Sequence, residues 1–140
     1  MKDLPFDGDR IPLEVGVENG IKWALYQWRD WVNGYVQLPE GHKLLDVGGY
    51  RIYEIDADIH GGITYDEDGW VGFDTTHGGD VWPSKEPVFV DKWTKLWNVD
   101  LVREEVLKLV KFVDESRVPT PKEIRIKELK AELEQLGEYL

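Results

Sequence analysis

The spacing of apolar residues changes twice along this chain, and no other feature limits its fold as strongly. Within residues 19–32 the apolar residues recur three or four positions apart, which predicts a helix that ends before Gly34. Within residues 53–60 they alternate with polar residues, which is the period of a half-buried strand. Helical spacing returns in residues 99–113. The pattern therefore predicts an α+β fold.

A β-hairpin is expected directly after the predicted strand. Residues 66–69 have the composition of a turn, and apolar residues flank them on both sides. We expect this turn to pair Tyr65 with Trp70. If the register continues along both strands, Asp58 lies opposite His77.

Two more helices complete the predicted architecture. The helix over residues 99–113 is expected to cover the sheet, with Asp91 or Asp100 as its N-cap. A proline-rich segment ends it, and the last helix then covers residues 121–140. The expected fold is a single domain over residues 1–140, in which a small antiparallel sheet, built around a central hairpin, packs against three helices.

The last predicted helix carries a heptad-like row of aliphatic residues. The row consists of Ile126, Leu129, Leu133, Leu136 and Leu140. It covers about two heptads, which is shorter than a typical coiled coil. The row is expected to pack on its own domain, and self-association of this helix into a homodimer is the alternative.

The charge of the chain limits its partners. The formal net charge at pH 7 is −11. Binding to nucleic-acid polymers or to anionic membranes depends on clusters of Lys and Arg, so the sequence argues against both. The chain has no cysteine, and no apolar run approaches the roughly 18 residues that a membrane span needs. We expect a cytoplasmic protein.

Two short clusters combine carboxylate, imidazole and a glycine pair, over residues 56–62 and 73–80. Such groups suit general acid–base chemistry, coordination of a metal ion, or hydrogen bonding to a polar ligand. The candidate catalytic residues are His60, His77, Asp58 and Asp74. The candidate ligand-binding residues are His42, Tyr35, Tyr65, Trp70, Asp80 and Trp82, where the aromatic side chains would stack on a planar group. Ordinary turn and surface roles remain the alternative.

The region around these clusters is strongly acidic. Residues 52–84 contain eight carboxylates and neither lysine nor arginine. A phosphate there would be repelled unless a divalent metal ion bridged it, or unless basic residues from other segments reached the site. The candidates for the latter are Arg29, Lys43, Arg51, Lys92 and Lys95. The sequence assigns no metal ligands, and its spacing matches no established catalytic motif.

Three stretches, residues 33–42, 56–64 and 70–80, together resemble a recurrent family of small uncharacterised proteins encoded by bacteriophages and prophages. The most specific parts are the HGG(I/L)T string and the GFD-x-x-H-x-G-D-like string. The resemblance implies an accessory protein in the host cytoplasm, of a kind that counters host defence by sequestering or cleaving nucleotide immune signals. By that analogy the residues lining the ligand site would be His42, His60, His77, Asp58, Asp74 and Asp80.

Three functions are therefore compatible with the sequence. The first is a phage-type accessory protein that binds a small polar, nucleotide-like ligand. The second is a hydrolase of the phosphodiesterase kind, in which His60 and His77 act as acid and base or hold a metal ion with nearby aspartates. The third is an acidic protein-interaction module that inhibits a host protein. Whether the ligand is turned over stays open.

Overall fold

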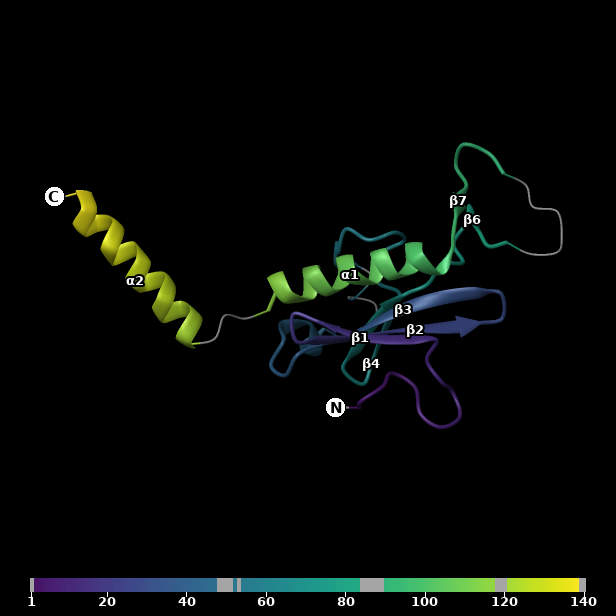
Figure 1. Cartoon of the computed structure of the whole chain (residues 1–140), viewed down its shortest axis with the longest axis horizontal. Helices are drawn as coiled ribbons and strands as arrows, with labels where there is room; N and C mark the ends of the chain where they lie inside the picture. Colours follow the sequence, from purple (N-terminus) through teal and green to yellow (C-terminus); the bar gives the residue numbers. More distant parts are fainter. Residues whose placement is uncertain (1, 48–51, 53, 84–89, 118–120, 139–140) are drawn as a thin grey trace.

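The chain folds around a five-stranded antiparallel sheet with the strand order β1-β2-β3-β5-β4 (Figure 1). A computed structural model describes residues 2–47, 52, 54–83, 90–117 and 121–138. The strands are β1 (Glu14–Glu18), β2 (Ile21–Trp28), β3 (Trp31–Gln37), β4 (Tyr65–Glu67) and β5 (Trp70–Phe73). With the helices described below, this sheet confirms the α+β class.

The prediction of a helix over residues 19–32 is wrong, because this segment forms all of β2 and the first two residues of β3. Tight turns at Asn19-Gly20 and at Arg29 reverse the chain, and all three residues have positive φ values of 52°, 76° and 53°. Both faces of these strands are largely buried. Apolar residues therefore fill nearly every position, and such a run matches helical spacing as well as strand spacing.

The strand predicted over residues 53–60 does not form. Residues 54–60 are irregular, and residue 53 lies outside the described residues. Asp58 has a φ of 53°, while Gly61 and Gly62 have φ values of 75° and 73°. Three positive φ values within five residues are incompatible with an extended strand. The alternation instead reflects a looped segment that buries Ala57.

The hairpin around residues 66–69 forms, but its register and position differ from the prediction. A two-residue turn at Asp68-Gly69 pairs Glu67 with Trp70, so Tyr65 lies opposite Gly72 instead of Trp70. The predicted pairing of Asp58 with His77 is consequently wrong. The hairpin is also not central, because β4 is an edge strand and β3 lies in the middle of the sheet.

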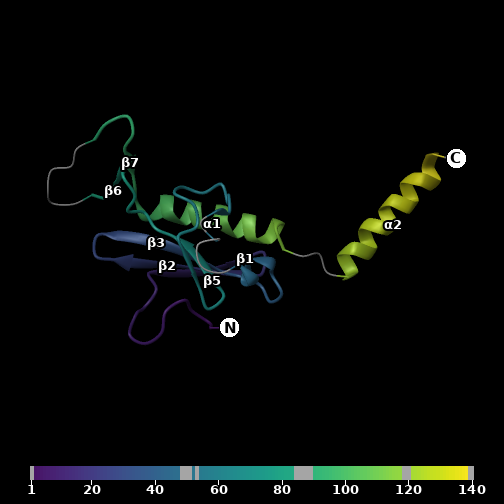
Figure 2. The ribbon, with the colours of Figure 1, turned by 180° about the vertical axis from the view of Figure 1, so that it is seen from behind.

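Helix α1 (Val99–Glu115) lies across one face of the sheet, as predicted, and contacts β2 and β3 (Figures 1 and 2). Its N-cap is Asn98, whose side chain accepts a hydrogen bond of 2.9 Å from the backbone N–H of Leu101. The predicted caps, Asp91 and Asp100, do not serve this role. No helix in the described part of the chain is long and apolar enough to cross a membrane.

Helix α2 (Pro121–Glu138) begins where the sequence predicts but does not pack on the domain. It stands away from the sheet and from α1 (Figures 1 and 2). Ile126, Leu129, Leu133 and Leu136 are all exposed. The described residues thus contain two α-helices instead of the three expected, together with a short 3-10 helix, η1 (Lys43–Asp46).

The sheet has a core on each face. The larger core lies between α1 and the sheet and includes Leu25, Phe73 and Val106. On the other face, Tyr26 and Trp70 belong to an aromatic cluster against which the N-terminal segment packs through Phe6. This division places the aromatic cluster on the opposite side of the sheet from α1.

Candidate functional site

The side chain of Asp80 is fully buried and joins three segments of the chain. Asp80 begins β6 (Asp80–Val81), which pairs in parallel with β7 (Lys95–Leu96). Its Oδ1 lies 2.6 Å from Nε2 of His60 and accepts a 2.9 Å hydrogen bond from Nε1 of Trp97. Its Oδ2 accepts a 2.9 Å bond from the backbone N–H of His77. The two sequence clusters therefore meet at this carboxylate.

Asp80 stays ionised in this environment. Burial alone would raise the pKa of its carboxyl group, but the hydrogen bonds from Trp97, from the backbone of His77 and from His60 outweigh burial and hold the pKa below its usual value. An ionised carboxylate can only accept hydrogen bonds. Nε2 of His60 must therefore carry the proton that it shares with Asp80, which fixes the tautomer of the neutral ring.

Asp80, Glu105 and Trp97 contact His60 and hold it in place. Its backbone N–H donates to Oε2 of Glu105 on α1 at 3.1 Å. Its ring packs edge-on against Trp97, with 5.2 Å between ring centroids. About a third of its side chain is exposed. Because Nε2 is engaged by Asp80, Nδ1 is the nitrogen that a ligand would meet, and in the neutral ring it is an acceptor.

His77 lies beside His60, with 6.3 Å between their ring centroids. Nε2 of His77 is 3.3 Å from Oδ1 of Asp74, and Nδ1 is 3.5 Å from Oδ2 of Asp80. Nδ1 is buried and makes no hydrogen bond to any described residue. Asp74 is fixed in turn by the hydroxyls of Thr64 and Thr76, at 3.0 and 2.8 Å. Two part-exposed imidazoles thus share one small surface.

Glycine is required at Gly61 and Gly79 for packing as well as for backbone conformation. Gly61 has a φ of 75°, and a Cβ atom there would lie 2.5 Å from Cε1 of His77. Gly79 has a φ of 90°, and a Cβ atom would lie 2.9 Å from the carbonyl oxygen of Trp93. Gly62 and Gly78 have open space around them. The first glycine of the HGG string therefore lets the His77 ring pack against the loop of His60.

Two lysines come close to this acidic site from other segments. Nζ of Lys95 lies over the ring of Trp97, 5.0 Å from its centroid. Nζ of Lys108 on α1 donates to Oε1 of Glu105 at 2.9 Å, and this hydrogen bond raises the pKa of the lysine. Lys95 was among the basic residues predicted to reach the site, whereas Lys108 was not. Lys92 packs over Trp93 instead.

Of the other predicted site residues, Trp82 lies at the site and Asp58 beside it. The ring of Trp82 stacks on Trp97 at 6.4 Å and 12°, and its Nε1 donates to Oγ1 of Thr75 at 3.0 Å. Asp58 is exposed and lines a pocket of about 280 Å³ with Lys108 and other residues of α1. Among the described residues, Asp58 makes no hydrogen bond or ion pair with His77.

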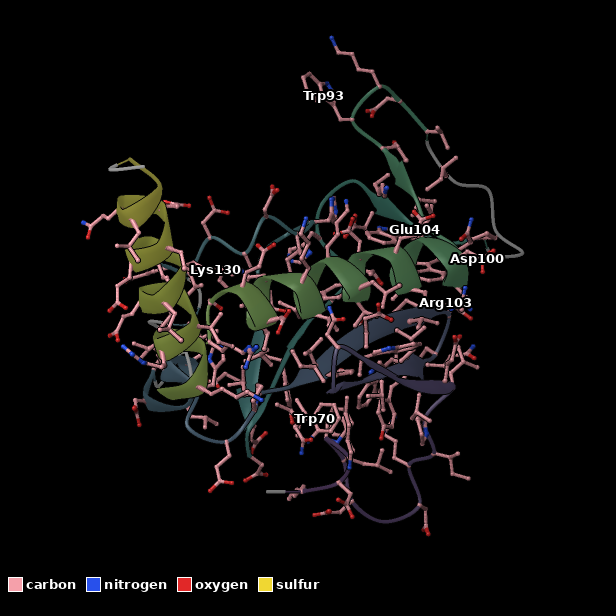
Figure 3. The ribbon with its side chains drawn as sticks, turned by 60° about the vertical axis from the view of Figure 1, so that its left-hand side comes forward. Trp70, Trp93, Asp100, Arg103, Glu104 and Lys130 are labelled. Atoms are coloured by element: carbon pink, nitrogen blue, oxygen red, sulfur yellow. The ribbon has the colours of Figure 1, made fainter. Side chains whose placement is uncertain are left out.

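The remaining predicted ligand-binding residues lie elsewhere. His42 is buried, where its Nδ1 accepts a 3.0 Å bond from the backbone N–H of Leu44 and its Nε2 lies 2.9 Å from the carbonyl oxygen of Val113. Burial lowers the pKa of His42. Tyr35, Tyr65 and Trp70 belong to the aromatic cluster on the sheet face opposite α1, and Figure 3 shows Trp70 there. The structure does not bring these four residues to His60 and His77.

Sequence reasoning missed two residues that build the site, Trp97 and Glu105. Trp97 is buried and donates to Asp80, and Glu105 is a nearly buried acid on an otherwise apolar helix face. The position of Glu105 among the apolar residues of α1 is the one signal that the sequence offered. Nothing in the sequence around Trp97 distinguishes it from a core tryptophan.

Within the described ranges, no three His, Asp or Glu side chains are placed to hold a metal ion. Comparisons with models of protein families, with curated proteins and with solved structures found no match.

Proposed function

We propose that the chain binds a small polar, nucleotide-like ligand at the surface formed by His60 and His77. One observation carries this proposal: two part-exposed imidazoles lie 6.3 Å apart, each within ion-pair distance of a carboxylate. Nδ1 of His60 offers an acceptor for a hydroxyl or amine group. His77, when protonated, would offer a positive charge to an anionic group of the ligand.

Two lysines suit the phosphate end of a nucleotide-like ligand, and Trp82 suits its base. Lys95 lies over Trp97 and Lys108 pairs with Glu105, and both of these partners contact His60. The two lysines would offset the acidity that otherwise repels a phosphate. Trp82 is partly exposed and adjoins the site through Trp97. Its ring would stack on a base. The phage setting suggested by the sequence makes cyclic nucleotide immune signals the first compounds to try.

Thermal unfolding against a panel of nucleotides and cyclic nucleotides tests this proposal. A compound that binds only the folded chain raises its apparent stability by mass action. We expect stabilisation of the native chain and its loss in the variants His60→Ala and His77→Ala. Asp58→Asn is the matched control, because it changes an exposed carboxylate of the same loop and should leave the stabilisation intact. Equal stabilisation of all four proteins would contradict the site.

A hydrolase in which His60 and His77 act as base and acid is the second candidate, and the 2.6 Å contact of His60 with Asp80 favours it. An imidazole oriented by a buried carboxylate is an effective general base. Nδ1 of His60 would take a proton from water as the water oxygen bonds to phosphorus. Protonated His77 would give its proton to the leaving oxygen as the P–O bond breaks. Chromatography of the stabilising compound after incubation decides between binding and turnover.

The exposed row on α2 favours a separate proposal, a protein contact made by this helix. A partner that packed on the exposed residues Ile126, Leu129, Leu133 and Leu136 would stabilise α2, because most helical stability in proteins comes from tertiary packing. A second copy of the chain is the simplest partner. Sedimentation at several concentrations would show a dimer that the variant Leu129→Glu abolishes. A monomer at every concentration would leave only a different protein as the partner.

A further inference from the structure

An exposed apolar row runs along β1, the strand at one edge of the sheet. Ile11, Leu13, Val15 and Val17 are 82%, 47%, 57% and 64% exposed. Val15 and Val17 lie on one face of β1 because alternate side chains of a strand point the same way. Ile11 and Leu13 precede β1, and the backbone N–H of Leu13 donates to the carbonyl oxygen of Leu25 at 2.7 Å, beside the pairing of Glu14 with the same residue. Edge strands of native proteins are usually protected by charge, proline or covering segments. An exposed apolar row on an edge strand is a surface along which a strand of another chain can pair.

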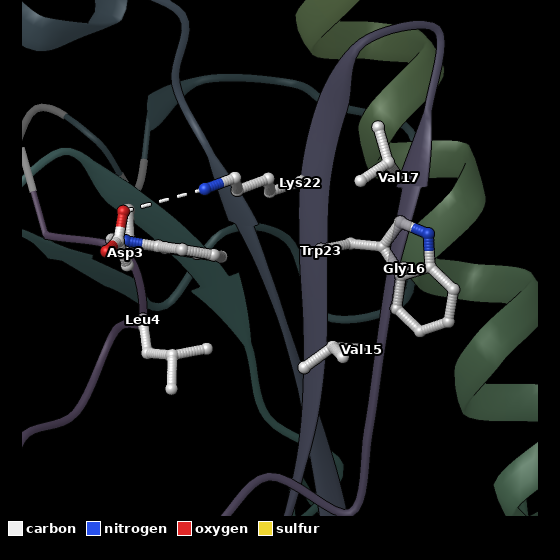
Figure 4. Close-up of a pocket in the computed structure, with 8 residues that line it drawn as sticks. Asp3, Leu4, Val15, Gly16, Val17, Lys22 and Trp23 are labelled. Atoms are coloured by element: carbon white, nitrogen blue, oxygen red, sulfur yellow. Dashed lines mark ion pairs between the residues drawn. The ribbon is translucent and has the colours of Figure 1, made fainter.

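A hollow of about 240 Å³ adjoins this row (Figure 4). Val15 and Val17 line it on the side of β1, and Leu4 lines it on the side of the N-terminal segment. Nζ of Lys22 reaches across to Oδ1 of Asp3 at 3.6 Å. The hollow is therefore apolar within and carries an exposed carboxylate at its rim. It has the size and character to receive one aliphatic side chain.

The free edge of β1 has backbone groups that point outward. The two-residue turn at Asn19-Gly20 makes Glu18 and Ile21 a hydrogen-bonded pair, as is general for hairpins of this length. Hydrogen-bonded and non-hydrogen-bonded pairs then alternate along the ladder. The N–H and C=O groups of Val15 and Val17 accordingly point away from β2. A strand laid along β1 would pair with them.

Charge favours a basic strand over a second copy of this chain. The first 22 residues carry five acidic and three basic side chains, and the whole chain carries −11. Glu14 already binds Arg103 through two hydrogen bonds of 2.6 and 2.7 Å, so the exposed Glu18 is the carboxylate of β1 that faces an added strand. A lysine or arginine opposite Glu18 would form an opposite-charge pair, whereas a second copy of this acidic chain would add to the repulsion.

We propose that β1 accepts an extended segment of another protein as a sixth strand of the sheet. The segment alternates aliphatic residues, which cover Val15 and Val17 and fill the hollow, with lysine or arginine, which faces Glu18. This is strand addition at a sheet edge, in which backbone hydrogen bonds give affinity and alternate side chains give specificity. The surface is separate from the site at His60 and His77.

Titration with a blocked peptide of about eight residues, in which valine alternates with lysine, tests the proposal. We expect it to bind the native chain, and a peptide with glutamate in place of lysine not to bind. The variant Val15→Pro removes one outward N–H without touching the pairing with β2. It should weaken binding of the peptide by about tenfold, because it removes one backbone hydrogen bond to the peptide and disturbs the hydrogen bond next to it. Val15→Thr is the matched control and keeps both the branched side chain and the N–H.

A second form of the test leaves the protein unchanged. The same valine–lysine peptide, N-methylated at alternate residues on its pairing edge, should lose binding while keeping its charge and apolar surface. Equal binding of the acidic peptide, or of the methylated peptide, would overturn the proposal. A dimer of the chain that Val15→Pro abolishes would overturn it as well, because β1 would then pair with its own copy.

Discussion

His60 and His77 each face a carboxylate, but the two pairs are built differently. The His60–Asp80 pair is short at 2.6 Å, and the carboxylate is fully buried among donors from three segments. The His77–Asp74 pair is longer at 3.3 Å, and a third of the Asp74 side chain is exposed. The first pair therefore holds the loops together, while the second pair is more open to solvent.

The substitution Asp80→Asn should have the largest effect, because it breaks the pair that holds the loops. The amide keeps the shape but removes the charge, and one of its atoms becomes a donor facing other donors. We expect a loss of about 2–4 kcal/mol in the free energy of unfolding. Urea denaturation measures it. A loss no larger than that of Asp74→Asn would show that the two pairs do not differ.

Acid should remove the stabilisation by Asp80. Its folded pKa is lowered, so the contribution is complete above the ordinary pKa of 3.8 and is lost as the pH falls through the folded value. We expect the native chain to lose more stability than Asp80→Asn as the pH is lowered from about 5 to 2. Denaturation curves at several pH values measure the difference. Parallel curves would contradict the assignment.

The substitution Gly61→Ala should have an intermediate effect, because it disturbs the contact between the two loops. It combines backbone strain with a clash against the His77 ring, for which we expect about 2–3 kcal/mol. Gly62→Ala is the matched control, with a similar φ and open space, and should cost about 1 kcal/mol. Thermal unfolding of both variants separates the clash from the strain.

The substitution Asp74→Asn should have the smallest effect on stability, about 0.5–1 kcal/mol, because the side chain is part-exposed and keeps its hydroxyl partners. It should nevertheless weaken ligand binding, since it removes the carboxylate beside Nε2 of His77. Thermal unfolding and ligand titration of the same preparation measure both quantities. A large loss of stability with unchanged binding would reverse the comparison.

The sequence predicted the elements that depend on local signals. α1 carries a clear helical stripe, the start of α2 follows a proline, and the turn at Asp68-Gly69 is marked by its composition. The prediction failed for β2 and β3, because strands buried on both faces have no period of two. Only tertiary packing distinguishes such a run from a buried helix.

The sequence also predicted only part of the candidate site, because local clusters are visible in a sequence and contacts between distant segments are not. Residues of both Asp/His/Gly clusters do meet, but through Asp80 rather than through strand pairing of Asp58 with His77. Trp97 and Glu105 reach the site from β7 and α1, which are distant in sequence. The expected register failed because the turn contains two residues instead of four, and a shift of this size changes every later pair.

The chain has three histidines, and their separate signals allow a direct test of whether His60 and His77 form one ligand site. The measurement is nuclear magnetic resonance of the imidazole Cε1–H signals during titration with a cyclic nucleotide. We expect the signals of His60 and His77 to shift together at one apparent Kd, while the signal of buried His42 stays in place. Shifts confined to His42, or none at saturating nucleotide, would contradict it.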